Sequence, residues 1–355
     1  MIIHSHAKDY EVHICKDYSF MDELKQIPNR LFVIDQKVYD IYKDKLFSGM
    51  PESDLFLIDA IEENKTIETA LSICERMTEI PAKRNATIIS FGGGIIQDIT
   101  GFASNVLYRG VNWKFVPTTL LAACDSCIGG KTSLNYKRFK NLLGTFFAPN
   151  DIYVCPQFFT TLSERDFESG LGEVVKFNYL TGADGVHNMS MYMDKLKARD
   201  AETVQRFLES SLQFKKRFIE EDEFDLGIRV YLNFAHTFGH AFETVSQYEI
   251  PHGTAVAMGT IVANRISLKR GWLEASLVEE MEKNLFEIIH VNITNELNHE
   301  EILKAISKDK KQEGSGITTV LLKEQKQQPM EIVIEHDTKR EEINEAVSYL
   351  FERIG

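Results

Sequence analysis

Three histidines and one glutamate have the residue types and spacing of a metal site. His236 and His240 stand four residues apart in HTFGH, and His252 lies sixteen residues after His236. On a helix, residues four apart share one face, so two imidazoles can meet one ion. Glu173 in GLGEVVKF is the best carboxylate to complete the site, and Lys176 follows it by one turn. The pattern predicts a divalent ion with room left for a substrate.

The histidine pair alone also has a simpler explanation. Two polar residues four apart occur on ordinary solvated helix faces. The His-Gly at 252 and the glycine-flanked Glu173 strengthen the metal interpretation. A metalloprotease is disfavoured, because HTFGH lacks the glutamate of an HExxH motif. Cys124 and Cys127 form a CxxC without a second pair, so buried cysteines are the simpler interpretation there.

A glycine-rich turn suggests a nucleotide site. Gly92, Gly93 and Gly94 follow an apolar strand and precede a helix predicted to begin near Ile95. Such glycines let the backbone approach a pyrophosphate, and the helix N-terminus offers unpaired N–H groups. The motif is not GxGxxG, and a tight connection explains it equally well. Asp98, one turn later, is awkward for phosphate and suits a ribose or nicotinamide-side group, or a solvated face.

Hydroxyls and cations follow in the same region. Thr118 and Thr119 end a second strand-to-helix segment, where they suit either a ligand or a helix N-cap. Lys131 follows two glycines, which favours a loop that presents N–H groups and an ammonium to an anion, although the Walker spacing is absent. Other cations recur beside glycines or candidate ligands: Lys140, Lys176, Lys215, Arg229, Lys310 and Lys311.

These residues must be positioned by two kinds of architecture. Apolar strands at 31–35, 55–59 and 86–90 alternate with a helix at 66–79, which predicts an α/β layer with a parallel sheet. The later part of the chain predicts helices at 199–223, 254–271 and 340–354. It also predicts one β-hairpin at 317–336. We therefore expect an α/β domain over 1–158 and a mainly α-helical domain over 159–355.

Composition limits the classes of function. The 355 residues are 43% hydrophobic and carry a net charge of −13. This charge argues against nucleic acid and against an anionic membrane as partners, whereas clustered cations can still attract a small anion. We expect no membrane span and no signal peptide. Five cysteines do not suggest a disulfide framework, so a cytoplasmic protein is expected.

Together these segments resemble the dehydroquinate synthase superfamily of sugar-phosphate cyclases. From about residue 85 to 260 the motifs follow in order: GGGIIQD, YRG, VPTTLLAACDS, GGKT, KNLLG, GLGEVVK, LNFAHTFGH and PHG. A weaker match continues through KDKKQEGSGITTVLL, and the first eighty residues match only in outline. There, residues 62–65 resemble the Glu-x-x-Lys cofactor loop of the family. So many spaced motifs in one order are highly specific.

The resemblance implies a fold and a set of residue roles. It implies an N-terminal Rossmann-like domain that binds NAD and a helical C-terminal domain that binds metal and substrate. The metal, zinc or cobalt, would be held by Glu173, His236 and His252. NAD would be surrounded by Asp35, Glu62, Lys65, Gly92, Gly93, Gly94, Asp98, Thr118, Thr119 and Lys140. Substrate would be faced by Asp125, Lys131, Asn141, Lys176, Lys215, Arg229, Asn233, His240 and Lys311. Arg109 in YRG would reach the phosphate site of a neighbouring subunit, which implies a homodimer.

The resemblance also suggests which cyclase reaction to expect. Some family members act on sugar phosphates without a carboxylate, whereas dehydroquinate synthases act on a phosphorylated sugar acid. In the members that act on the sugar acid, the resemblance implies that a lysine and an arginine bind the substrate carboxylate, and both are present here as Lys215 and Arg229. A neutral sugar would not provide the two acceptor oxygens that a guanidinium binds. We therefore expect NAD- and metal-dependent cyclisation of 3-deoxy-arabino-heptulosonate 7-phosphate to 3-dehydroquinate with release of phosphate, in the shikimate pathway.

Several positions depart from the family pattern. Ala235 stands where glycine is usual before HTFGH, Thr254 replaces a usual glutamate, and Gln97 replaces a common glycine. These departures keep open a diverged cyclase of the amino-dehydroquinate, 2-epi-valiolone or 2-deoxy-scyllo-inosose type. A metal-dependent polyol dehydrogenase of similar build and a non-catalytic binding protein are the remaining alternatives.

Overall fold

The computed structural model describes residues 1–81, 83–291, 297–308, 316–325 and 329–354. By their contacts, these residues form two compact units. The first unit consists of Met1–Thr161 and Ile219–Phe224, and the second consists of Leu162–Phe218 and Asp225–Gly355. The chain therefore returns once to the first unit after it has entered the second.

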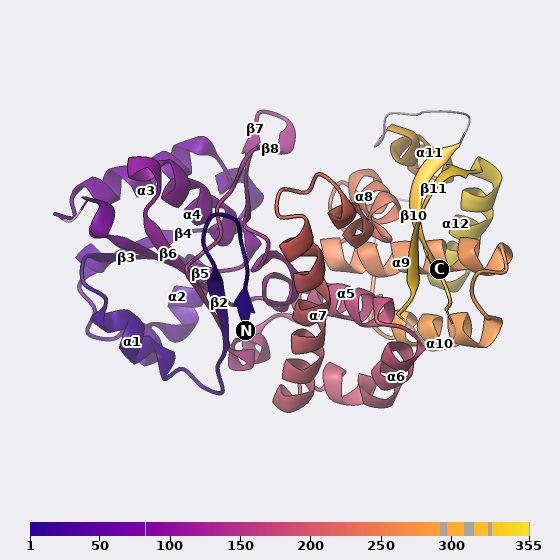
Figure 1. Ribbon diagram of the computed structural model, residues 1–355, viewed down its shortest axis with the longest axis horizontal. Helices are drawn as coiled ribbons and strands as arrows, with labels where there is room; N and C mark the ends of the chain where they lie inside the picture. Colours follow the sequence, from indigo (N-terminus) through magenta and orange to yellow (C-terminus); the bar gives the residue numbers. More distant parts are fainter. Residues whose placement is uncertain (82, 292–296, 309–315, 326–328, 355) are drawn as a thin grey trace. The chain divides into compact units, whose positions relative to one another are not determined.

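A seven-stranded sheet forms the centre of the first unit (Figure 1). Its strands follow the order β1 (Ile2–Ile3), β2 (Tyr10–Ile14), β9 (Asp151–Val154), β6 (Asn112–Pro117), β5 (Thr87–Gly92), β3 (Arg30–Asp35) and β4 (Leu55–Ile58). All neighbouring strands pair in parallel, except β1 and β2 at one edge. Every residue of β5 is buried, as is typical of a parallel strand with both faces covered.

The order of the strands creates a natural binding edge. The helices of this unit are α1 (Phe20–Gln26), α2 (Gln36–Tyr42), α3 (Ile67–Thr78) and α4 (Gly94–Val106). The chain passes from β3 through α2 to β4 in one direction, and from β5 through α4 to β6 in the other. Right-handed crossovers in opposite directions place α2 and α4 on opposite faces of the sheet. The reversal between β3 and β5 is a topological switch point, where ligands bind beyond the carboxyl ends of the strands.

Short elements complete the first unit. A hairpin of β7 (Lys131–Tyr136) and β8 (Phe139–Phe146) pairs outside the main sheet and contacts α4. The single-turn elements are η1 (Lys43–Phe47), η2 (Glu52–Asp54), η3 (Glu62–Asn64), η4 (Lys83–Asn85), η5 (Leu107–Arg109), η6 (Ala122–Ser126) and η7 (Pro156–Thr161). Of these, η1 and η6 are π-helices, a form that is frequent at functional sites.

The second unit is built around one buried helix. Its elements are α5 (Glu164–Leu180), α6 (Ala183–Lys197), α7 (Ala201–Glu221), η8 (Ile228–Asn233), α8 (His236–Val245), α9 (His252–Lys269), α10 (Ala275–Phe286), α11 (His299–Lys308), β10 (Ile317–Lys323), β11 (Glu331–Thr338) and α12 (Arg340–Ile354). Helix α9 contacts α5, α8, α10, α12 and β10 (Figure 1). It is apolar or small on nearly every face, as a helix enclosed by others must be.

The expected fold class is confirmed: an α/β unit with a mostly parallel sheet precedes a mainly helical unit. The strands expected at 31–35, 55–59 and 86–90 are β3, β4 and β5, and the late hairpin is β10 with β11. The antiparallel β1–β2 edge and the β7–β8 hairpin go beyond what was predicted. Within the described residues, none of the helices combines the length and apolar character needed to cross a lipid bilayer.

Candidate active site

A close crossing of α5 and α9 brings two of the metal-site candidates together. A Cβ added at Gly172 would lie 2.0 Å from the carbonyl oxygen of Gly253, and one added at Gly253 would lie 1.7 Å from that of Ser169. Only glycine therefore permits these backbones to approach so closely. Glu173 follows Gly172 and His252 precedes Gly253, so the crossing sets the carboxylate beside the imidazole.

Helix α8 delivers the second imidazole. His236 is the first residue of α8, and it follows Ala235, whose φ of 69° is left-handed. Glycine adopts this conformation without strain, so an alanine here costs backbone strain that a glycine would avoid. A Cβ added at Gly259 of α9 would lie 2.4 Å from the carbonyl oxygen of Ala235, so α8 and α9 are also in close contact.

Glu173, His236 and His252 converge in the second unit. Glu173 Oε1 lies 3.4 Å from Nε2 of His236 and 3.4 Å from Nε2 of His252. One ligand atom from each residue lies within 4.8 Å of the others. Nδ1 of His236 is 3.0 Å from the carbonyl oxygen of Phe234, and Nδ1 of His252 is 3.2 Å from the carboxylate of Glu243. When both Nδ1 atoms donate, both Nε2 lone pairs face Glu173 and are available to an ion.

The surroundings of Glu173 fit a metal ion. Its side chain is fully buried, and neither oxygen has a hydrogen-bond partner of acceptable geometry. Lys176 Nζ lies 2.7 Å from Oε2 as an ion pair, whereas Oε1 lies 3.4 Å from Nε2 of each of the two imidazoles. A buried carboxylate is costly unless cations or donors balance it. Two imidazole nitrogens and one carboxylate oxygen form a donor set that suits zinc.

The pKa values of these groups follow from burial and from neighbouring charges. Burial would raise the pKa of Glu173, but the Lys176 ammonium and the two imidazoles outweigh it and hold that pKa well below its ordinary value. Burial and the charge of Lys176 lower the pKa of His236, which favours the neutral ligand form. Burial would also lower the pKa of His252, but the neighbouring carboxylates of Glu173 and Glu243 raise it to about 10.

His240 belongs to a different group from the one suggested by the HxxxH spacing. Its ring lies 5.4 Å from that of His236, but the metal-compatible group around Glu173 takes His252 instead. His240, which is exposed, forms a second possible group with Glu243 and His252. The two groups share His252, so His240 lies beside the Glu173 group without belonging to it.

The remaining candidates of the second unit differ in burial. Lys176, Lys215 and Arg229 are buried, at 1%, 6% and 4% exposure, whereas Asn233 is exposed. Lys176 Nζ also donates to the carbonyl oxygen of Leu232 at 3.2 Å, next to Asn233. Buried cations are rare in structural roles, because desolvation is costly without a specific anionic partner. Lys311 lies outside the described residues.

In the first unit, the candidate cofactor residues gather at the carboxyl edge of the sheet. Asp35 ends β3 and caps α2, and Gly92 ends the neighbouring strand β5. The Thr118 N–H donates to the Gly92 carbonyl oxygen at 2.9 Å, and a Cβ added at Gly93 would lie 3.0 Å from Cγ2 of Thr119. The structure therefore brings these five residues to the switch point.

This edge fits a dinucleotide. Gly94 begins α4, and the nearest atom that an added Cβ would meet is Ser126 Oγ at 3.8 Å, so the start of the helix is open to an approaching group. The N–H groups at the N-terminus of this thirteen-residue helix suit a pyrophosphate. Burial raises the pKa of Asp35, and its carboxylate at the end of β3 can accept hydrogen bonds from ribose hydroxyls.

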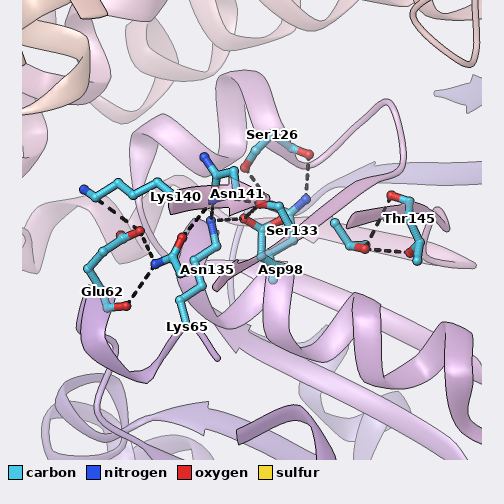
Figure 2. A network of polar contacts seen from close by, with 11 residues as sticks. Glu62, Lys65, Asp98, Ser126, Ser133, Asn135, Lys140, Asn141 and Thr145 are labelled. Carbon is cyan, nitrogen blue, oxygen red and sulfur yellow. Dashed lines mark hydrogen bonds and ion pairs between the residues drawn. The ribbon is translucent and has the colours of Figure 1, made fainter. Parts of the chain in front are cut away.

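A polar network connects helix α4, the loop at 62–65 and the β7–β8 hairpin (Figure 2). Lys65 Nζ lies 2.6 Å from Asp98 Oδ2 and 2.6 Å from Asn141 Oδ1. The Ser133 N–H and hydroxyl each donate to Asp98 at 3.0 Å, and the hydroxyl is also 2.9 Å from Asn141 Oδ1. Burial raises the pKa of Asp98, although Lys65 and Ser133 act in the opposite direction. Three separately predicted residues, Lys65, Asp98 and Asn141, therefore meet.

The same network extends to two further candidates. Glu62 Oε1 accepts from Asn135 Nδ2 at 2.8 Å and lies 4.0 Å from Lys140 Nζ (Figure 2). Neither Asn135 nor Ser133 was identified from the sequence. A short polar residue in a hairpin usually serves only the turn, and Glu62 lies 73 positions before Asn135, so no local pattern could reveal this contact.

The turn that carries Asp125 is fixed by Gln97. Asp125 lies in the π-helix η6, next to Ser126. Gln97 is buried and forms a reciprocal pair with Ser126, with Nε2 donating to the carbonyl oxygen at 2.6 Å and Oε1 accepting from Oγ at 2.7 Å. Gln97, one of the departures from the family pattern, therefore stabilises this turn. Lys131 is exposed and begins β7 directly after Gly130, whose φ of 65° is left-handed.

Arg109 lies in a strained turn. Tyr108, Arg109 and Gly110 have consecutive positive φ values of 52°, 64° and 109°. Arg109 is exposed, and Arg84 Nε donates to the carbonyl oxygen of Tyr108 at 3.1 Å. Strain of this kind persists where the surroundings fix the backbone, and it concentrates at functional sites.

Two family models match this chain over most of its length. The model described as 3-dehydroquinate synthase N-terminal matches residues 55–169, and the one described as 3-dehydroquinate synthase C-terminal matches residues 170–312. The chain belongs to the 3-dehydroquinate synthase family. It is accordingly an enzyme of that type, a cyclase that eliminates phosphate.

Curated relatives agree with this assignment. The 3-dehydroquinate synthase of Clostridium tetani is 34% identical over 329 residues, which cover 92% of this chain and 88% of the relative. That of Dictyoglomus thermophilum is 32% identical over 321 residues, which cover 89% of this chain and 90% of the relative. Both matches extend well beyond the motif-rich region.

Solved structures show the same fold. A 2-epi-5-epi-valiolone synthase from Streptomyces hygroscopicus, with NAD+ and Zn2+ bound, has a TM-score of 0.82 at 23% identity, and the match covers 97% of each chain. A 2-deoxy-scyllo-inosose synthase with carbaglucose-6-phosphate, NAD+ and Co2+ has a TM-score of 0.77 at 21% identity, and the match covers 98% of each chain. Glycerol dehydrogenase from Schizosaccharomyces pombe shares the fold less closely, with a TM-score of 0.62 at 13% identity, and covers 97% of this chain and 89% of its own.

Proposed function

We propose that this protein converts 3-deoxy-arabino-heptulosonate 7-phosphate to 3-dehydroquinate and phosphate, as a step of the shikimate pathway. The convergence of Glu173, His236 and His252 carries this proposal, because it supplies a metal-compatible site within a fold whose family performs this reaction. The α/β unit would bind NAD, and the helical unit would bind the metal and the substrate.

The side chains of the second unit would hold the metal and the sugar acid. Nε2 of His236, Nε2 of His252 and Oε1 of Glu173 would bind one zinc or cobalt ion. When bound, the ion supplies a Lewis acid for a substrate hydroxyl, and NAD supplies a reversible hydride acceptor. Lys176 holds the second oxygen of Glu173 and so keeps the first oriented towards the imidazoles.

Two buried cations support an acidic substrate. Lys215 and Arg229 would pair with the substrate carboxylate, because a guanidinium forms two parallel hydrogen bonds with a carboxylate. A neutral sugar offers no such pair of acceptors to a guanidinium, so the two cations favour an acidic substrate. Asp125, Lys131, Asn141, Asn233, His240 and Lys311 are proposed to line the rest of the substrate site.

The carboxyl edge of the sheet would receive NAD. The start of α4 offers N–H groups to the pyrophosphate, and Asp35 offers a carboxylate to the ribose. The remaining cofactor contacts are proposed for Glu62, Lys65, Gly92, Gly93, Gly94, Asp98, Thr118, Thr119 and Lys140. We further propose a homodimer in which Arg109 serves the neighbouring phosphate site. A reducing cytoplasm would suit the five free cysteines.

Phosphate release tests the proposed reaction. Purified protein with NAD and zinc or cobalt should release phosphate from 3-deoxy-arabino-heptulosonate 7-phosphate without net accumulation of NADH. A chelator should abolish turnover, and added zinc or cobalt should restore it. Glu173→Gln should lower both bound metal and kcat, by about 100-fold or more for kcat.

Matched measurements separate this reaction from its alternatives. Glu345→Gln, the same change at an exposed glutamate that pairs with Lys269, should leave metal content and turnover unchanged. Preferred turnover of sedoheptulose 7-phosphate or glucose 6-phosphate would contradict the proposed substrate. Net NADH formation from a polyol would instead identify a dehydrogenase.

A further inference from the structure

Asn135 occupies an irregular position in the β7–β8 hairpin. The ladder pairs Leu134 with Leu143 and Tyr136 with Phe139, so Asn135 stands opposite three residues of β8. At the centre of those three is Asn141, which has a left-handed φ of 53°. Its N–H donates to the Asn135 side-chain carbonyl at 2.9 Å. The side chain of Asn135 thus replaces a ladder partner and supports the unusual backbone of Asn141.

The other end of the Asn135 amide holds the loop around Glu62. Nδ2 of Asn135 donates to Glu62 Oε1 at 2.8 Å and to the Glu62 carbonyl oxygen at 3.2 Å. The backbone N–H of Asn135 donates to the carbonyl oxygen of Lys65 at 2.7 Å. One residue therefore contacts both ends of the 62–65 loop while it holds the hairpin.

These contacts set the geometry of the Lys65 ammonium. Lys65 Nζ lies 2.6 Å from Asn141 Oδ1 and 2.6 Å from Asp98 Oδ2, and Lys65 is buried. If the hairpin moved relative to the loop, Lys65 would lose Asn141 while remaining paired with Asp98. Figure 2 shows Asn135 between Glu62 and Lys65, at the junction of these two arms.

We infer that Asn135 is a positioning residue, which fixes Glu62, Lys65 and Asn141 in the relative arrangement that the cofactor and substrate require. This inference rests on the proposed function, because that function gives the three side chains their roles. Only an amide of this length meets both demands: its oxygen accepts from Asn141, and its nitrogen donates to Glu62. The polar contacts of Asn135 within the described part of the chain are with Glu62, Lys65 and Asn141, so it acts through these neighbours.

Two substitutions test separately the hydrogen bonds that the Asn135 side chain forms with Asn141 and with Glu62. Asn135→Asp keeps the acceptor for Asn141 but places a carboxylate against Glu62, so the loop should shift. We expect the dissociation constant of NAD to rise about tenfold, with kcat at saturating NAD reduced less than about threefold. Asn135→Leu removes both arms, and here kcat should also fall by about tenfold, because Asn141 loses its support.

The readouts distinguish positioning from general destabilisation. NAD binding is followed by calorimetric titration, turnover by phosphate release, and folding by thermal unfolding. Asn188→Asp makes the same change at a half-buried α6 residue that accepts from Arg206, and it should alter none of the three measurements. If Asn135→Asp does not fold, Asn135→Ser, which is uncharged but too short to reach both partners, replaces it.

Specific outcomes would overturn the inference. NAD affinity in Asn135→Asp equal to that of the wild type, with or without a lower unfolding temperature, would show that Asn135 does not position the site. If the proposed function were wrong, the result would be different: the wild type would bind NAD but release no phosphate from the sugar acid. The NAD titration therefore tests the role of Asn135 even if the enzyme acts on another substrate.

Discussion

Glu173 shows how a single side chain can point to a ligand. A fully buried carboxylate gains nothing for the stability of the fold unless its charge is balanced. Lys176 balances one oxygen, and the other faces two imidazoles whose Nδ1 atoms already have acceptors. A nonpolar residue would fill the same space at lower cost, so the carboxylate is explained by what it binds rather than by packing.

Asp98 predicts a pH dependence of NAD binding. Its pKa is raised by burial, despite the opposing effects of Lys65 and Ser133, so it takes up a proton at a pH above the ordinary value of 3.8 as the solution is acidified. Protonation breaks the ion pair with Lys65, and the affinity for NAD should fall in that range. Calorimetric titration of NAD at stepwise lower pH measures this loss.

A neutral variant provides the control for Asp98. Asp98→Asn cannot titrate, so its affinity for NAD should be weaker at neutral pH but should lack the acid step. Because the raised pKa disfavours the charged form, Asp98 makes the fold less stable as the pH rises through that pKa. An identical acid step in Asp98→Asn would assign the titration to another group.

At the scale of elements, the metal site depends on how closely helices can cross. Gly172→Ala should push α5 from α9, because the new Cβ would lie 2.0 Å from the carbonyl oxygen of Gly253. Overpacking should destabilise the protein by about 1–3 kcal/mol, as measured by urea unfolding. Bound zinc should also be lost, because Glu173 adjoins the displaced residue, and elemental analysis would show this.

Gly271→Ala is the matched control for this crossing. Gly271 follows the other end of α9 with a left-handed φ of 69°, and among the described residues beyond its chain neighbours no atom lies within 4 Å of an added Cβ. The variant should lose about 1 kcal/mol through backbone strain but keep its zinc. Full zinc occupancy in Gly172→Ala would mean that the crossing does not set the ligand geometry.

The same scale explains what the sequence could predict. The helix expected at 340–354 coincides with α12 (Arg340–Ile354), because its apolar stripe repeats with the helical period. Strand β8 escaped prediction, because most of its residues are exposed and it lacks a buried alternating face. The metal residues were named through motifs, but the proximity of Glu173 to His252 depends on a glycine crossing between helices about eighty positions apart.

At the scale of the whole molecule, the net charge and the proposed substrate have the same sign. A charge of −13 repels a phosphorylated acid at long range, but salt screens this repulsion beyond roughly 8 Å. Recognition must therefore come from local cations. Lys176, Lys215 and Arg229 are buried, where screening is weak, so each can contribute far more to binding than a surface charge. Acidic character overall and an anionic substrate are thus compatible.

The proposed homodimer makes the last prediction. If Arg109 serves the neighbouring subunit, Arg109→Ala and Glu173→Ala should each be inactive alone but complement each other when co-expressed. In a mixed dimer, one site combines intact Glu173 with intact Arg109, and the other site carries both defects. Random pairing in a twofold dimer should then give about a quarter of wild-type phosphate release. Mixing Glu173→Ala with His252→Ala, which alter the same site, should restore nothing. Absence of recovery in the first mixture, with mixed dimers demonstrated by two affinity tags, would place Arg109 in its own subunit's site.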